Sequence, residues 1–164
     1  QLWAIVGCGV KIGACAMYDI SLTHQSLPSE EYIRLLGIAM CVFSSNNGFI
    51  IENVIHTDAS QSWRDLIDKE SGQLKTTIAA TITKVAGDDI QKKFSDIVVR
   101  RNRIIHGFRI TSKAGEQILG TKDKKTQEQF EISEDYLREF IRANDELSQM
   151  LERYRQSITW ADAD

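Results

Sequence analysis

The stretch RRNRIIHGF, residues 100–108, holds three side chains that are able to act together on a phosphate group. An arginine guanidinium is permanently charged and forks onto two phosphate oxygens. A histidine imidazole takes up and releases protons near neutral pH, and an asparagine carboxamide orients such groups by hydrogen bonding. Arg101, Asn102 and His106 are therefore the candidate catalytic residues.

RNA cleavage needs no more than these groups, because the substrate supplies its own nucleophile in the 2′-hydroxyl. A base removes the proton of that hydroxyl, an acid protonates the leaving 5′-oxygen, and a cation stabilises the charge of the transition state. In this interpretation His106 moves protons, Arg101 stabilises charge, and Asn102 orients His106 or binds the phosphate. The reaction requires neither a cofactor nor a metal, and the three scattered histidines predict no metal site.

These residues fall on a predicted helix over residues 88–106. Asp88 is its expected N-cap, and Gly107 is expected to end it in the left-handed conformation. The apolar residues recur at helical spacing and form one stripe, which comprises Ile90, Phe94, Ile97, Val98, Ile104 and Ile105. This stripe is expected to pack against other helices.

Arg101 lies near the middle of that stripe when each residue is placed about 100° from the last, whereas Asn102 and His106 share one flank. A charged side chain on a buried face is costly unless it is paired or solvated. A second copy packed across a two-fold axis would relieve Arg101 by forming a polar cleft. We therefore expect a homodimer with two Arg101 and two His106 side chains around one RNA backbone.

The run of Arg101, Asn102, three further residues and His106 resembles the motif of the HEPN family. That motif is an arginine, usually followed by a polar residue, and a histidine after four to six residues. The resemblance covers about 20 residues closely, and it implies a helical bundle, a homodimer with a composite cleft and a metal-independent endoribonuclease activity. Effectors of this kind act in toxin–antitoxin systems and in antiviral defence against phages. Some members carry a modified tyrosine two positions after the histidine, where this chain has Phe108, so regulation by that route is not expected.

Two other functions stay open from the sequence. The main alternative is a catalytically inactive helical module, in which Arg101 and Asn102 serve dimerisation or bind RNA or a nucleotide. The other is a regulatory subunit of a larger enzyme assembly. An antitoxin or another regulatory partner is a further expectation of the nuclease hypothesis.

The charge distribution favours an anionic partner only near the motif. The whole chain has a net charge of −3, yet residues 88–125 hold 10 basic and 5 acidic side chains. This basic block predicts an anion site within an acidic protein. We assign Arg100, Arg103 and Arg109 to RNA binding through phosphate contacts, although a solvated charged surface explains the same pattern.

Length and composition predict one helical domain over residues 1–164. The chain has 42% apolar and 26% charged residues, which suffices for a core of its own. Its three cysteines form no C-x-x-C pair, so we expect neither disulfides nor zinc, and a cytoplasmic location is the simplest interpretation. The apolar run over residues 2–17 is short and contains Lys11, which favours a buried helix over contact with a membrane.

One proline and long stretches of helical periodicity predict an all-α bundle of about five helices. They are expected over residues 2–25, from Ser29 to His56 with an interruption near residues 46–48, over 72–87, over 88–106, and from Ser133 onward. Strand is an open alternative for residues 72–87, which are rich in threonine and isoleucine. Between the last two helices, the pattern around Gly115 and Gly120 predicts a small β-hairpin or an extended loop.

Overall fold

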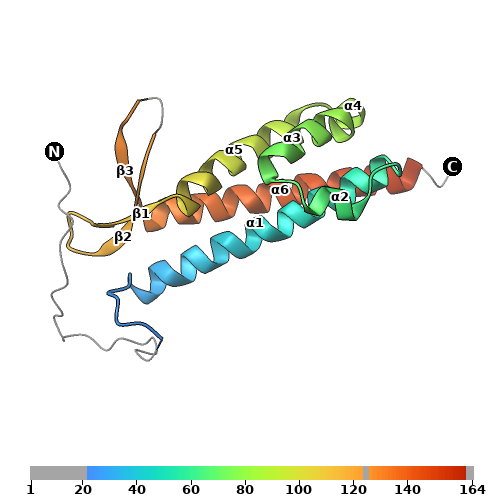
Figure 1. Ribbon diagram of the computed structural model, residues 1–164. Coiled ribbons are helices and arrows are strands. Elements are labelled where there is room, and N and C mark those ends of the chain that lie inside the picture. Colours follow the sequence, from blue (N-terminus) through green and yellow to red (C-terminus); the bar gives the residue numbers. More distant parts are fainter. Residues whose placement is uncertain (1–21, 124–125, 162–164) are drawn as a thin grey trace.

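The computed structural model describes residues 22–123 and 126–161, which form six helices and three strands (Figure 1). The helices are α1 (Glu30–Thr57), α2 (Trp63–Ile67), α3 (Ser71–Ala80), α4 (Ile82–Ala86), α5 (Asp89–Ile105) and α6 (Glu134–Ala161). The strands are β1 (Phe108–Thr111), β2 (Gln117–Lys122) and β3 (Gln129–Ile132). The expected predominance of helix is confirmed. The expected hairpin is a three-stranded sheet, so the fold is not purely all-α.

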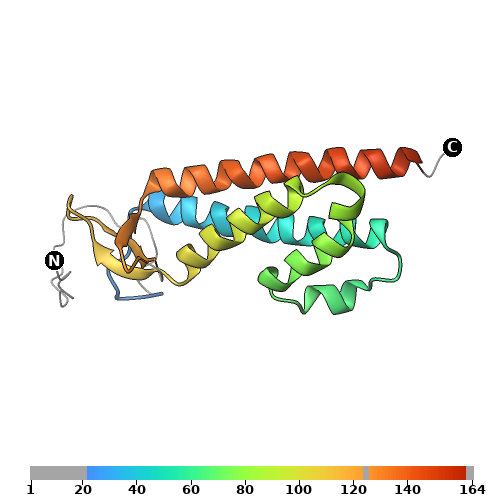
Figure 2. The same ribbon diagram turned by 90° about the horizontal axis from the view of Figure 1, so that it is seen from above.

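The two longest helices, α1 and α6, lie side by side along most of the molecule (Figures 1 and 2). The Ser29 hydroxyl caps α1 by accepting a hydrogen bond from the Tyr32 N–H at 3.2 Å. The expected interruption near residues 46–48 is wrong, because α1 runs unbroken to Thr57. The buried Asn46 side chain donates to the carbonyl of Asn144 on α6 at 2.7 Å instead of competing for the α1 backbone.

The last helix begins as the sequence predicts. The Ser133 hydroxyl accepts a hydrogen bond from the Tyr136 N–H at 3.1 Å. Ile132, before this cap, and Leu137, in the first turn of α6, are both fully buried, as a hydrophobic staple requires. Because β3 ends at Ile132, the sheet passes directly into α6.

The segment between α1 and α5 differs in detail from the prediction. Residues 72–87 are helical, so the strand alternative is wrong, but the helix is broken at Thr81 into α3 and α4. Thr81 has φ of −123° and ψ of −89°, outside the helical region, and its hydroxyl donates to the Thr77 carbonyl at 2.7 Å. The short helix α2 was not predicted. Residues 22–25 are not helical, and the rest of the helix expected over 2–25 lies outside the described residues.

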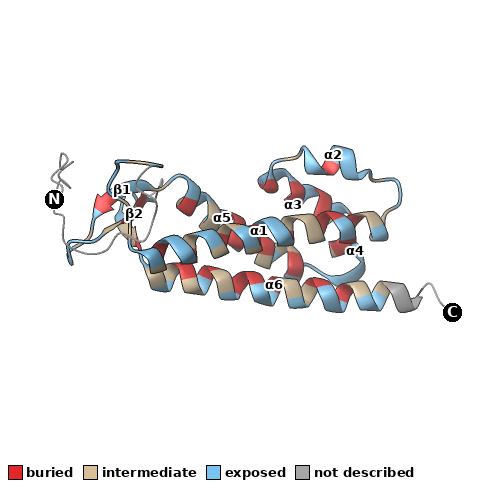
Figure 3. Cartoon of the chain, turned by 90° about the horizontal axis from the view of Figure 1, so that it is seen from below, coloured by how far each residue is buried: buried red, intermediate tan, exposed pale blue. Residues whose placement is uncertain are grey.

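Helix α5 packs against α6 and α3 and reaches the sheet at its C-terminal end (Figure 2). Buried residues line the inner sides of α1, α5 and α6 (Figure 3). The stripe predicted for α5 is buried except at Ile105, which is 46% exposed. By length and mean hydropathy alone α1 resembles a membrane span, a test that the core helix of a globular protein also meets.

The three strands form an antiparallel sheet in the order β1-β2-β3. Gly115, with φ of 84°, lies in the turn between β1 and β2, as expected. Gly120 does not lie in a turn but inside β2, where it pairs with Phe108. A Cβ at Gly120 would lie 3.0 Å from the Ile110 side chain, so glycine lets that side chain pack closely against β2.

Candidate functional site

The C-terminal end of α5 carries the candidate residues into a tight junction with the sheet. His106 is the C-cap, and its N–H donates to the Asn102 carbonyl at 3.1 Å. The left-handed conformation expected for Gly107 is wrong, because the described glycines with positive φ are Gly87 and Gly115. Glycine leaves space at 107, since a Cβ there would lie 3.0 Å from the Ile104 carbonyl oxygen, closer than ordinary van der Waals contact.

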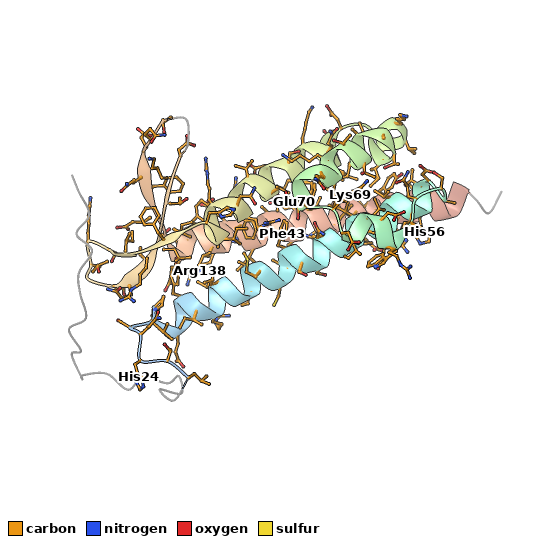
Figure 4. The ribbon with its side chains drawn as sticks, in the orientation of Figure 1. His24, Phe43, His56, Lys69, Glu70 and Arg138 are labelled. Carbon is orange, nitrogen blue, oxygen red and sulfur yellow. The ribbon has the colours of Figure 1, made fainter. Side chains whose placement is uncertain are left out.

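Arg101 is held by two residues from other helices. Its Cζ lies 4.7 Å from the ring centroid of Phe43 on α1, and its Nη2 donates to the Ser71 hydroxyl on α3 at 2.8 Å. Figure 4 labels Phe43 in the middle of the molecule, near Glu70, the residue before Ser71. Phe43 and Ser71, which we call the Arg101 seat, are 8% and 7% exposed. From the sequence we expected a second copy of the chain to relieve the buried charge of Arg101. Phe43 and Ser71 of the same chain provide polar and cation–π contacts for it instead.

The guanidinium is not fully satisfied in this seat. Within the described part of the chain, Arg101 Nε is buried and has no hydrogen-bond partner. Asn47 Oδ1, one helical turn along α1 from Phe43, is likewise buried without a partner among the described residues. A buried donor or acceptor without a partner is costly. Arg101 Nε and Asn47 Oδ1 therefore each retain an unused hydrogen-bonding position.

The side chains of Asn102 and His106 lie on a different side of α5 from Arg101. Both residues are exposed, and five helical steps turn position 106 by roughly 140° from position 101. Across the described residues, no hydrogen bond joins the side chains of Arg101, Asn102 and His106. A single chain thus brings Asn102 and His106 to one flank but does not bring Arg101 and His106 together.

The three arginines assigned to RNA binding already contact other side chains. Arg100 Nε lies 2.8 Å from Asp96 Oδ2, Arg103 Nη2 lies 3.1 Å from Asp123 Oδ2, and Arg109 Nε donates to Gln117 Oε1 at 2.7 Å. The Arg100 and Arg103 side chains are each 34% exposed. A phosphate group at either one would compete with a carboxylate, which weakens their assignment to RNA binding.

Arg103 also joins an aromatic cluster that the sequence did not reveal. Its Cζ lies 5.3 Å from the ring centroid of Phe130 on β3, and that ring lies 6.2 Å from the ring of Tyr136 on α6. Burial raises the pKa of the Tyr136 phenol, and the neighbouring Arg103 charge opposes that rise. Together with Asp123, these side chains fasten the sheet to α5 and α6 beside the motif.

Three large apolar side chains close to His106 in sequence are exposed. Val99 and Ile105 on α5 are each 46% exposed, and Phe108 at the start of β1 is 42% exposed. Val99 lies two helical turns before His106 on the same flank. Large apolar side chains that are exposed to solvent are candidates for an interaction surface.

Sequence reasoning missed Phe43, Ser71, Asp123 and Phe130 because no spacing pattern connects them to the motif. Among the described residues, no group of three or more histidine, cysteine, aspartate or glutamate side chains is placed to hold a metal ion. Comparison of the chain with protein-family models, curated proteins and solved structures found no match in any of the three. The HEPN resemblance of residues 101–106 therefore stays a prediction.

Proposed function

We propose that this protein is a metal-independent endoribonuclease, in which two copies of the chain form one composite site around His106. The observation that supports this proposal is the exposed flank of α5. It presents an imidazole, the Asn102 carboxamide and the exposed side chain of Val99, and Ile105 and Phe108 are exposed within two residues of His106 in sequence. An apolar surface beside a group able to transfer protons favours a site that is completed by a partner.

A second copy supplies the second proton carrier that the proposed reaction requires. Arg101 and His106 diverge around α5, so one chain does not present a cation and a proton carrier to the same phosphate. Two flanks related by a two-fold axis bring two imidazoles together, one as base and one as acid. A stable dimer buries roughly 1,200–2,000 Å² in total, and the three exposed apolar residues supply the centre of such an interface.

In the proposed reaction, one His106 takes the proton of the ribose 2′-hydroxyl while that oxygen attacks phosphorus. The bond to the 5′-oxygen breaks, and the second His106 gives its proton to this leaving group. The products are a 2′,3′-cyclic phosphate and a 5′-hydroxyl. The Arg101 guanidinium stabilises the negative charge of the transition state, and Asn102 orients the neighbouring imidazole.

In this proposal the protein works in the cytoplasm on RNA as a toxin–antitoxin or phage-defence effector, with an antitoxin or another regulatory partner restraining it. The Arg101 and His106 pair of the HEPN-like motif is the basis for that biological role. The role is secondary to the chemistry, which is testable with the purified protein.

The test compares the wild type with His106→Ala on total RNA in EDTA, followed by analysis of the RNA ends. We expect wild-type cleavage to survive the chelator and the variant to lose roughly 10²–10⁴-fold in rate. His24→Ala is the matched control, because His24 is an exposed histidine that precedes α1, far from α5 (Figure 4). Intact RNA with the wild type, or equal cleavage by His106→Ala, would contradict the proposal.

Mixing the two proteins tests whether the site is composite. When wild type exchanges subunits with a threefold excess of His106→Ala, cleavage per wild-type chain should fall to about a quarter, because only wild-type pairs retain both imidazoles. Activity per wild-type chain that does not change on mixing would show that each chain acts alone. Sedimentation of the wild type at micromolar concentration reports the dimer independently.

The inactive binding module is the second candidate function. The observation that favours it is the Arg101 seat, which gives the arginine a role in packing α1, α3 and α5 within one chain. This candidate predicts that wild type and His106→Ala both leave RNA intact while still binding it or dimerising. The cleavage experiment separates the two candidates directly.

A further inference from the structure

The Arg101 seat holds the guanidinium in one place before any substrate binds. The Phe43 ring restricts its plane, and the Ser71 hydroxyl restricts its rotation through Nη2. Arginine has five N–H donors. The Nε–H is buried and one Nη2 hydrogen bonds to Ser71, and among the described residues the other three Nη hydrogens of this half-buried side chain have no partner.

The Ser71 hydroxyl is not needed by its own helix. Glu70 is the N-cap of α3, and its N–H donates to the Gln73 side chain at 3.2 Å. In the described part of the structure, the Ser71 hydroxyl has a hydrogen bond to Arg101 alone. Arg101 lies 30 residues further along the chain. The role of this buried hydroxyl is therefore to hold the Arg101 guanidinium in place.

We infer that Phe43 and Ser71 are positioning residues of the proposed nuclease, which fix the Arg101 guanidinium with its remaining Nη–H groups available for the scissile phosphodiester. This inference rests on the proposed function. An arginine side chain has several rotatable bonds, so fixing it beforehand removes an entropic cost from the transition state. Catalytic groups held by a rigid supporting layer keep the productive geometry, and three helices form that layer here.

The experiment measures kcat and KM for RNA cleavage in EDTA by Ser71→Ala, Ser71→Thr and Phe43→Leu. Thr77→Val is the matched control, because it removes a buried hydroxyl from the same helix, one that accepts a hydrogen bond from Lys69 rather than from Arg101. We expect Ser71→Ala and Phe43→Leu to lower kcat roughly tenfold to hundredfold with little change in KM. Ser71→Thr, which keeps the hydroxyl, should restore most of the rate.

The Nε–H NMR signal of Arg101 gives a readout that does not depend on RNA. In the wild type it should be shifted upfield by the Phe43 ring, and Arg101→Lys identifies it by its disappearance. Phe43→Leu should abolish that shift, and Ser71→Ala should broaden the signal as the guanidinium gains freedom. Circular dichroism of each variant shows whether it is folded.

The outcomes separate the inference from the function on which it depends. If the wild type cleaves RNA, His106→Ala does not, and folded Ser71→Ala retains the wild-type kcat and Arg101 signal, the positioning role is refuted and the nuclease stands. If neither the wild type nor His106→Ala cleaves RNA, the proposed function fails and the positioning role fails with it.

Discussion

Gly107→Ala adds one methyl group where α5 meets the sheet. The added Cβ would lie 3.0 Å from the Ile104 carbonyl oxygen, 3.3 Å from the Gly120 carbonyl oxygen and 3.3 Å from Leu119 Cβ. Two of these atoms belong to the backbone and cannot turn away, so the backbone at the end of α5 and in β2 must shift by a few tenths of an ångström to admit the methyl group. Overpacking of this kind costs about 1–3 kcal/mol.

One opposing effect must be subtracted from that cost. Alanine restricts the unfolded chain more than glycine does, which stabilises the folded state by about 0.4–1 kcal/mol where the native backbone accepts it. Gly107 lies outside the positive-φ region, so this gain applies. From the midpoints of the two ranges we therefore expect Gly107→Ala to lower the free energy of unfolding by about 1.3 kcal/mol, or roughly 3–5 °C in Tm.

Gly37→Ala is the matched control and should act in the opposite direction. Gly37 is an exposed position inside α1, and nothing lies within 4 Å of a Cβ built there. Removing a glycine from a helix interior should raise the free energy of unfolding by about 0.5–1 kcal/mol. Urea denaturation followed by far-ultraviolet circular dichroism measures both variants.

The reasoning is refuted if Gly107→Ala is as stable as the wild type, or if both variants shift stability in the same direction. The first result would mean that the backbone where α5 meets the sheet shifts without loss of stability. The second would mean that the contacts of the added Cβ do not determine the change in stability. Since His106 precedes Gly107, cleavage measured well below Tm should also fall in Gly107→Ala and stay unchanged in Gly37→Ala.

Two further predictions concern the cluster that fastens the sheet. In a double-mutant cycle with Arg103→Ala and Asp123→Ala, urea denaturation should give a coupling of about 0.5–1 kcal/mol, because the pair is only partly shielded from water; a coupling near zero would contradict its role as a fastener. Burial raises the pKa of the Tyr136 phenol above its unfolded value of about 10. The contribution of this shift to the free energy of unfolding is therefore complete below about pH 10 and is lost as the pH rises through the folded pKa. The free energy of unfolding should therefore fall in alkaline solution, and Tyr136→Phe should show a smaller fall unless Tyr136 ionises equally in both states.

The local features of the fold were predictable because each depends on residues a few positions apart. Ser29 and Ser133 cap the two long helices, and Ile132 with Leu137 forms the expected staple. The buried stripe of α5 follows helical periodicity up to Ile104. Ile105 departs from it and is 46% exposed; it lies one turn beyond Arg101, the residue that contacts Ser71 at the start of α3.

Features that depend on neighbouring elements were not predictable. Gly107 looked like a left-handed terminator, but the closeness of β2 makes glycine necessary there. Asn46 looked like a helix breaker, yet α6 offers it a carbonyl partner. Arg103 was assigned to phosphate binding from its charge, and no spacing pattern indicates that the return of the sheet places Asp123 and Phe130 beside it.

The sequence by itself determined the chemical types at residues 101–106, their place near the end of a helix and the presence of Arg101 on its apolar side. Only the tertiary structure decided what Arg101 contacts. Ser71 is 30 residues away from it in sequence, and Phe43 lies on a different helix again. Helical periodicity shows which side of a helix is buried, but the partner on that side depends on how distant helices pack together.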